Sequence, residues 1–135
     1  MYTTRRITLV LILALSLASL ALYGCGSGED KEVTLTEADN GTSVTLKKGQ
    51  VLAITLPARP TRGERWDPSD LSVYKELPMG RDQFRPDSNI EHYDGYQILR
   101  FEAKTRGSYD LHLVYRVVGA EDKPLATFEV SLTIE

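Results

Sequence analysis

The sequence has little that supports covalent cross-linking or nucleophilic catalysis. Cys25 is the only cysteine, and His92 and His112 are the only histidines among 135 residues. One cysteine excludes an internal disulfide and a multi-thiolate metal site, so packing of apolar side chains must stabilise the fold. The glycine-rich, lysine-ending loop that cradles phosphates is also missing. We therefore predict that the chain is not an enzyme and takes no cofactor.

Charge and length limit the remaining function classes. The chain carries 16 basic and 19 acidic residues, and Arg5 and Arg6 lie in an N-terminal segment that we expect to be removed. The remaining residues carry a net negative charge, which would be repelled by the phosphates of a nucleic acid. No nucleic-acid partner is therefore predicted. About 110 residues remain after that removal, enough for one core and too few for a second cofactor-binding domain.

The N-terminus has the pattern of an export signal. Residues 1–6 are short and basic, and the apolar run at residues 7–22 is shorter than the roughly 18–20 residues of a membrane-spanning helix. We therefore interpret residues 1–24 as a signal peptide. The segment Leu22-Tyr23-Gly24-Cys25 resembles the bacterial lipobox, in which the cysteine thiol receives a diacylglyceryl group.

The lipobox resemblance implies that the protein is exported and lipid-anchored to a membrane of the bacterial cell envelope through Cys25. Residues 25–32 would then be the lipidated cysteine and a flexible tether, which is polar and rich in glycine. Residues 33–135 would form one domain. Because Cys25 carries the lipid in this interpretation, no thiol remains for catalysis.

The domain shows the alternation of half-buried strands. Residues 109–117 and 126–134 each place apolar side chains at every second position, and weaker strand patterns cover residues 33–36, 43–46, 51–56, 71–76 and 96–103. The long stretch from Glu76 to Glu91 has no regular pattern, and no window has helical periodicity. About seven short strands predict an all-β fold, an immunoglobulin-like antiparallel β-sandwich.

Few residues suggest chemistry. His112 falls on the polar face of a predicted strand, where exposure to solvent explains it. His92 and Asp94 share a loop, but two ligands do not make a metal site, so no metal is predicted. Trp66 stands near a strand start and is expected to be a core aromatic residue.

The segment from Leu56 to Trp66 is the clearest candidate for binding. Pro57 and Pro60 restrict its backbone, so the loop is expected to hold one shape and to lose little entropy on binding. This loop resembles that of the chagasin family, the I42-type inhibitors of papain-like cysteine proteases. The family pattern Asn-Pro-Thr-Thr-Gly, an aromatic residue and then Trp is matched here by Pro60, Thr61, Gly63 and Trp66. The resemblance extends from residue 41 to residue 134.

The resemblance implies a protein that binds a papain-like cysteine protease through three loops at one end of the sandwich. Asp94-Gly95-Tyr96-Gln97 stands at the second loop of the family, and residues 117–122 stand at the third. The positions implied to contact the protease are Arg59, Pro60, Thr61, Arg62, Gly63, Asp94, Gly95, Tyr96, Val117, Val118 and Gly119.

The chain departs from the family pattern in two of these loops. Arg59 replaces Asn, Arg62 replaces the second Thr, and Glu64 replaces the aromatic residue. Residues 117–119 are Val-Val-Gly where the family has Arg-Pro-Trp, which removes an aromatic anchor. An alternative function is therefore an envelope protein–protein interaction module with the same fold and no protease inhibition.

Overall fold

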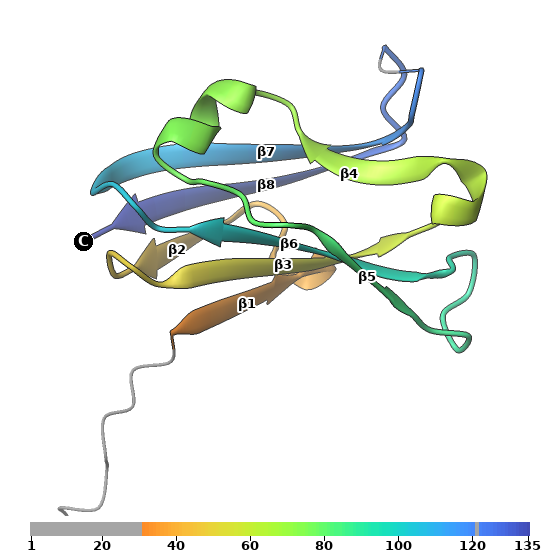
Figure 1. The fold of residues 1–135 in the computed structure, drawn as a ribbon, viewed down its shortest axis with the longest axis horizontal. Coiled ribbons are helices and arrows are strands. Elements are labelled where there is room, and N and C mark those ends of the chain that lie inside the picture. The colour runs from red at the N-terminus through yellow and green to blue at the C-terminus, as the bar shows by residue number, and fades with distance from the viewer. Residues whose placement is uncertain (1–30, 121) are drawn as a thin grey trace, which may run out of the picture.

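The computed structural model describes residues 31–120 and 122–135. The predicted signal peptide at residues 1–24, Cys25 and the tether up to residue 30 lie outside the described residues. Within the described part, two sheets face each other and three short 3₁₀ helices lie in the connections (Figure 1). None of these helices has the length and apolar character needed to cross a membrane. The elements in chain order are β1 Glu32–Thr36, η1 Glu37–Asp39, β2 Thr42–Leu46, β3 Val51–Ala58, η2 Pro60–Arg62, β4 Glu64–Pro68, η3 Leu71–Lys75, β5 Gln83–Pro86, β6 Gly95–Glu102, β7 Gly107–Val117 and β8 Ala126–Ile134.

Each sheet contains four of these described strands, in the orders β1-β3-β6-β5 and β2-β8-β7-β4. The chain passes from the first sheet to the second and back as it runs through β1, β2 and β3, and it reverses direction each time. β1 and β3 therefore run the same way and pair in parallel, and β2 pairs in parallel with β8. The other four pairs are antiparallel.

The predicted β-sandwich is confirmed, and the predicted strand at residues 126–134 has the bounds of β8. The two parallel pairs make both sheets mixed, whereas we expected antiparallel pairing throughout. This difference arises because a strand pattern gives the buried face of a strand but not the direction of its neighbour.

Two local expectations were wrong, and one strand was missed. Residues 71–76 were expected to be a strand, but η3 occupies most of them because the Asp70 side chain caps this turn, accepting a hydrogen bond from the Ser72 N–H at 2.8 Å. The irregular stretch from Glu76 to Glu91 contains β5, which pairs with β6. β4 was not predicted, since three of its five residues are charged.

Apolar side chains fill the space between the sheets. β8 shows the alternation most clearly, with Phe128, Val130, Leu132 and Ile134 buried and the residues between them exposed. Trp66 is only 5% exposed, which confirms it as a core residue. Burying a large apolar side chain is worth roughly 1.5–3 kcal/mol, so the core supplies the stability that disulfides do not. β3, β6 and β7 contribute Leu52, Ile54, Leu56, Leu99, Phe101, Leu111 and Leu113.

Gln97 connects the two sheets through hydrogen bonds. Its amide oxygen accepts from the Trp66 N–H at 2.7 Å, and its Nε2 donates to the Trp66 carbonyl at 2.9 Å and to Asp82 at 3.1 Å. Gln97 lies on β6 in one sheet and Trp66 on β4, an edge strand of the other. The amide therefore satisfies both Trp66 backbone groups on the free side of β4, as a neighbouring strand would at that position.

We expect Gln97→Glu to lower the free energy of unfolding by about 2–3 kcal/mol at neutral pH, because a carboxylate accepts but cannot donate and the Trp66 carbonyl would stay buried without a partner. Equilibrium unfolding in urea measures this change. Gln83→Glu is the matched control, since Gln83 lies exposed on the neighbouring strand β5. Its effect should stay within about 0.5 kcal/mol. Equal effects of the two substitutions would contradict the role given to Gln97.

Candidate functional site

Three chain connections meet at one end of the sandwich, which we call the loop end (Figure 1). β3 stops at Ala58, which pairs with Gly95 at the start of β6. β4 begins at Glu64, which pairs with Val117 at the end of β7. These registers place residues 59–63, the connection before Gly95 and the turn after Val117 side by side.

The central loop, residues 59–63, is a single tight turn. Pro60–Arg62 form η2, and Gly63 ends it with a φ of 72°, a left-handed conformation that suits glycine. The Gly63 N–H donates to the Pro60 carbonyl at 2.9 Å, and the Arg62 N–H donates to the Arg59 carbonyl at 3.0 Å. Pro60 stands at the first position of the turn, where its fixed φ is favourable.

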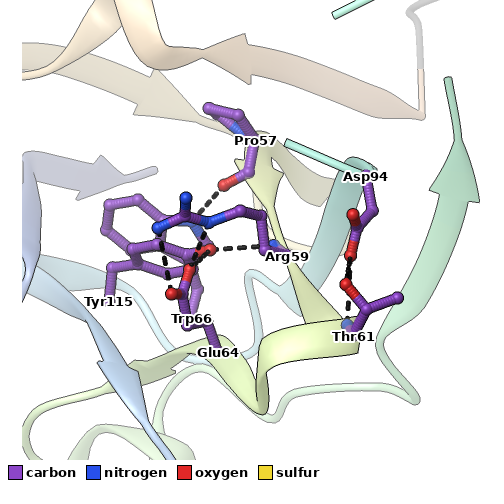
Figure 2. Close-up of polar contacts among 7 residues, drawn as sticks. All are labelled: Pro57, Arg59, Thr61, Glu64, Trp66, Asp94 and Tyr115. Carbon is purple, nitrogen blue, oxygen red and sulfur yellow. Dashed lines mark hydrogen bonds and ion pairs between the residues drawn. The ribbon is translucent and has the colours of Figure 1, made fainter. Parts of the chain in front are cut away.

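Asp94 holds the tip of the central loop from the second connection (Figure 2). One carboxylate oxygen accepts from the Thr61 hydroxyl at 2.6 Å and from the Thr61 N–H at 3.0 Å, while the Asp94 N–H donates to the Ala58 carbonyl at 3.0 Å. The hydroxyl contact first, and the backbone contact next, hold the pKa of Asp94 below its usual value. Thr61 and Asp94, two of the positions that the family resemblance implies for protease contact, are thus bonded to each other.

Gly95 and Tyr96, which follow Asp94, do not contact the central loop in the same way. A Cβ on Gly95 would lie 2.8 Å from the Pro86 Cα, so this glycine permits close approach of β5 and β6. Tyr96 alternates with the inward-facing Gln97, and its ring packs against the Arg85 guanidinium, whose carbon lies 5.2 Å from the ring centroid. Tyr96 therefore lies on the outer face of its sheet, away from the central loop.

The third connection is tied to the central loop through its backbone. The Val118 N–H donates to the Gly63 carbonyl at 2.9 Å, and the Val118 side chain is 61% exposed. Pro60, Gly63, Phe84 and Val118 supply apolar atoms to a shallow groove beside the central loop. Exposed apolar atoms thus occupy the place where the family pattern has its aromatic anchor.

A buried carboxylate lies directly beneath the central loop. Glu64 is 6% exposed, and its two oxygens accept hydrogen bonds from the Arg59 guanidinium at 2.8 and 3.0 Å (Figure 2). The Tyr115 hydroxyl donates to the same carboxylate at 2.7 Å and accepts from the Arg59 N–H at 2.8 Å. Burial alone would raise the pKa of Glu64, but the hydrogen bonds from Arg59 and Tyr115 lower it overall.

Aromatic packing supports this carboxylate. The Tyr115 and Trp66 rings stack with centroids 4.9 Å apart, and the Trp66 Nε1 donates to the Pro57 carbonyl at 2.9 Å. Burial, and then the hydrogen bond to Glu64, raise the pKa of Tyr115 above its usual value, so its hydroxyl stays a donor over a wide pH range. The base of the central loop is therefore continuous with the core.

Glu64, Tyr115 and Gln97 were not identified as site residues from the sequence. Glu64 stands two positions before Trp66, and two residues at that spacing in a strand lie on the same face. A carboxylate beside a core tryptophan was therefore the available signal. The hydrogen bonds themselves join residues 51 apart for Tyr115 and Glu64, which no local pattern reveals.

Metal chemistry has no support within residues 31–120 and 122–135, where no group of three His, Cys, Asp or Glu side chains is placed to hold an ion. Asp94 is engaged by Thr61, and His92 is exposed with a φ of 66°. His112 is also exposed, as predicted, and its Nδ1 lies 3.2 Å from the Glu129 carboxylate.

A rigid β-sandwich with three connected loops at one end defines a scaffold that presents loops to a partner. Comparison with known proteins gives the family. The family model for the chagasin family peptidase inhibitor I42 matches residues 45–134, and this chain belongs to that family. Among curated proteins, no sequence matches the chain. Membership of an inhibitor family confirms the resemblance and the prediction that the chain is not an enzyme.

Several solved structures share the fold. The cysteine protease inhibitor EhICP2 from Entamoeba histolytica matches with a TM-score of 0.66 and 16% identity, over 77% of this chain and 95% of that one. Amebosin matches with a TM-score of 0.54 and 23% identity, over 76% and 96% of the two chains. For the Leishmania mexicana ICP the TM-score is 0.50 and the identity 21%, over 72% and 90%.

The contact between Thr61 and Asp94 predicts a measurable titration. Because the pKa of Asp94 is lowered in the folded protein, the charged contact is present above the unfolded value of about 3.9 and is lost as the pH falls through the lowered folded value. Thr61→Val removes the hydroxyl donor and keeps the backbone donor. The pKa of Asp94 should therefore rise part of the way towards the unfolded value of about 3.9.

Carboxyl NMR chemical shifts followed against pH measure this change. Asp70 is the internal reference, since its pKa is lowered by Ser72 at a distant site. A variant in which both carboxyl groups titrate as in the parent would contradict the role of the Thr61 hydroxyl.

Proposed function

We propose that this chain is a reversible inhibitor of papain-like cysteine proteases that inserts the loop end into the active-site cleft. The observation that carries the proposal is the set of hydrogen bonds joining the three connections: Thr61 to Asp94, and Val118 to Gly63. These bonds hold residues far apart in sequence as one surface before any partner binds. The similar structure from Entamoeba histolytica is named a cysteine protease inhibitor, which supports this target class.

The geometry favours binding without turnover. Pro60, Thr61, Arg62 and Gly63 form the turn of the central loop, and all four are exposed. A turn of this kind offers no extended backbone in register for cleavage. Because the loop is already ordered, its docking costs little conformational entropy, and more of the contact energy appears as affinity.

A second candidate is an envelope module that recognises another protein with the same loop end. The observation favouring it is the turn after β7, where Val118 and its neighbours replace the aromatic anchor of the family. Aromatic anchors often contribute about 2 kcal/mol or more, so their loss changes which partners bind tightly.

We also propose that the mature protein begins at Cys25 and is held to a bacterial envelope membrane by a lipid on that residue. The lipobox-like segment supports this proposal. β1 starts at Glu32, so the sandwich begins seven residues after the cysteine. A chain of that length is a short tether between the sandwich and a membrane.

Inhibition is tested with residues 26–135 and a panel of papain-like proteases, with a serine protease as the class control. We expect reversible, submicromolar inhibition of cysteine enzymes only. Gly63→Gln should raise the inhibition constant at least about 30-fold, because its side chain would project from the surface that enters the cleft.

Gly49→Gln is the matched control for that substitution. Gly49 has a φ of 93°, and open space surrounds both glycines. Both substitutions should therefore cost a similar 1–2 kcal/mol of stability, approximately, from left-handed backbone strain. Gly49 lies at the opposite end of the sandwich, so its variant should inhibit as the parent does. Equal inhibition by the two variants would show that the central loop does not enter the cleft.

The anchor is tested by Cys25→Ala in the full chain, expressed in a bacterial host with a lipoprotein pathway. The parent should partition with membranes and require detergent for extraction, whereas the variant should move to the soluble fraction. Incorporation of labelled fatty acid into the parent alone is the second readout. An unchanged distribution, with no label in the parent, would refute lipidation.

A further inference from the structure

Two of the departures from the family pattern lie in direct contact. Arg59 precedes the central-loop turn and Glu64 follows it, and the guanidinium binds both oxygens of the carboxylate at 2.8 and 3.0 Å (Figure 2). The Glu64 N–H also donates to the Arg59 carbonyl at 3.3 Å. The two replacements therefore form one interaction that spans the base of the central loop.

The pair is largely buried and has a third partner, Tyr115, so the loss of either side chain should destabilise the loop. Arg59 is 27% exposed and Glu64 is 6% exposed. Removing the cation beside such a buried carboxylate strongly destabilises the protein, because the charge is then left without a partner. The cost is largest where water cannot take the place of the cation. The Tyr115 hydroxyl binds both the Glu64 carboxylate and the Arg59 N–H, so the backbone of the loop is held by the same cluster as the side chain.

We infer that Arg59 and Glu64 act together as positioning residues, which hold the central loop in its binding shape and do not themselves contact the protease. This inference rests on the proposed function. Each replacement depends on the other: Arg59 needs a buried acceptor, and Glu64 needs a cation beside it. Since Glu64 neutralises Arg59, Arg62 is the exposed cation that the central loop presents to a partner.

The first test needs no protease. Amide hydrogen–deuterium exchange is measured for the purified protein and for Arg59→Gln, Glu64→Gln and the double variant. Exchange at residues 61–64 should rise at least about tenfold in each single variant, and by more than exchange in β7 and β8, which reports the loss of global stability. In the double variant two neutral amides replace the ion pair, so its exchange should rise by less than the two single effects combined.

Arg100→Gln is the matched control. Arg100 Nε lies 3.0 Å from the Glu32 carboxylate, an Arg–Glu pair of similar length at the far end of the sandwich. This control should leave exchange at residues 61–64 unchanged. If Arg59→Gln does not fold, Arg59→Lys replaces it. Lysine keeps the positive charge beside Glu64 and loses only the bidentate hydrogen bonding of the guanidinium. Loop exchange equal to the parent in the folded variants overturns the inference.

The second test separates positioning from contact. If the variants only lower the fraction of molecules with a competent loop, the association rate with a papain-like protease should fall about tenfold or more while the dissociation rate changes less than about twofold. A rise confined to the dissociation rate would mean that Arg59 contacts the protease, which overturns the inference. If the parent inhibits no protease, the proposed function fails, and the exchange measurements still decide whether the pair positions the loop.

Discussion

The Glu64 carboxylate lies inside the open end of the sandwich, and the organisation of that end follows from the need to keep it hydrogen-bonded. Its partners come from two distant places in the chain: Arg59 before the central turn and Tyr115 on β7. Tyr115 stacks on Trp66, so the charged cluster rests on the apolar core. Burial of one charge thereby connects the conformation of a surface loop to the packing between the sheets.

The two sheets are also joined by polar groups close to this cluster. Gln97 binds both backbone groups of Trp66, and the Trp66 ring binds the Pro57 carbonyl on β3. β4 is an edge strand that pairs with β7 on one flank, and on the other flank the Gln97 amide satisfies the Trp66 backbone. Such fully paired buried groups restrict how the sheets can slide, which keeps the three connections at fixed positions relative to one another.

The sequence predicted those parts of the fold that repeat with period two. β7 and β8 were found because their apolar residues alternate without interruption, and the sandwich followed from the number of such strands. β4 was missed because charged residues surround its one tryptophan. The position of Thr61 beside Asp94 came only from the resemblance, since the two residues are 33 apart and their contact depends on the register of β3 with β6. The pairing of Arg59 with Glu64 joined two residues that had each been treated as a separate departure.

The parallel pairing of β1 with β3 places the N-terminal attachment point of the sandwich at the end opposite the loops. β3 leads into the central loop, and β1 runs beside it in the same direction, so Glu32 lies at the far end, where β8 also finishes (Figure 1). The eight residues of β3 span roughly 25 Å. A molecule coupled through its N-terminus to a bead, a sensor chip or a bilayer would therefore point its loops into the bulk solution. A dense layer of such molecules would expose one kind of surface to whatever approaches it.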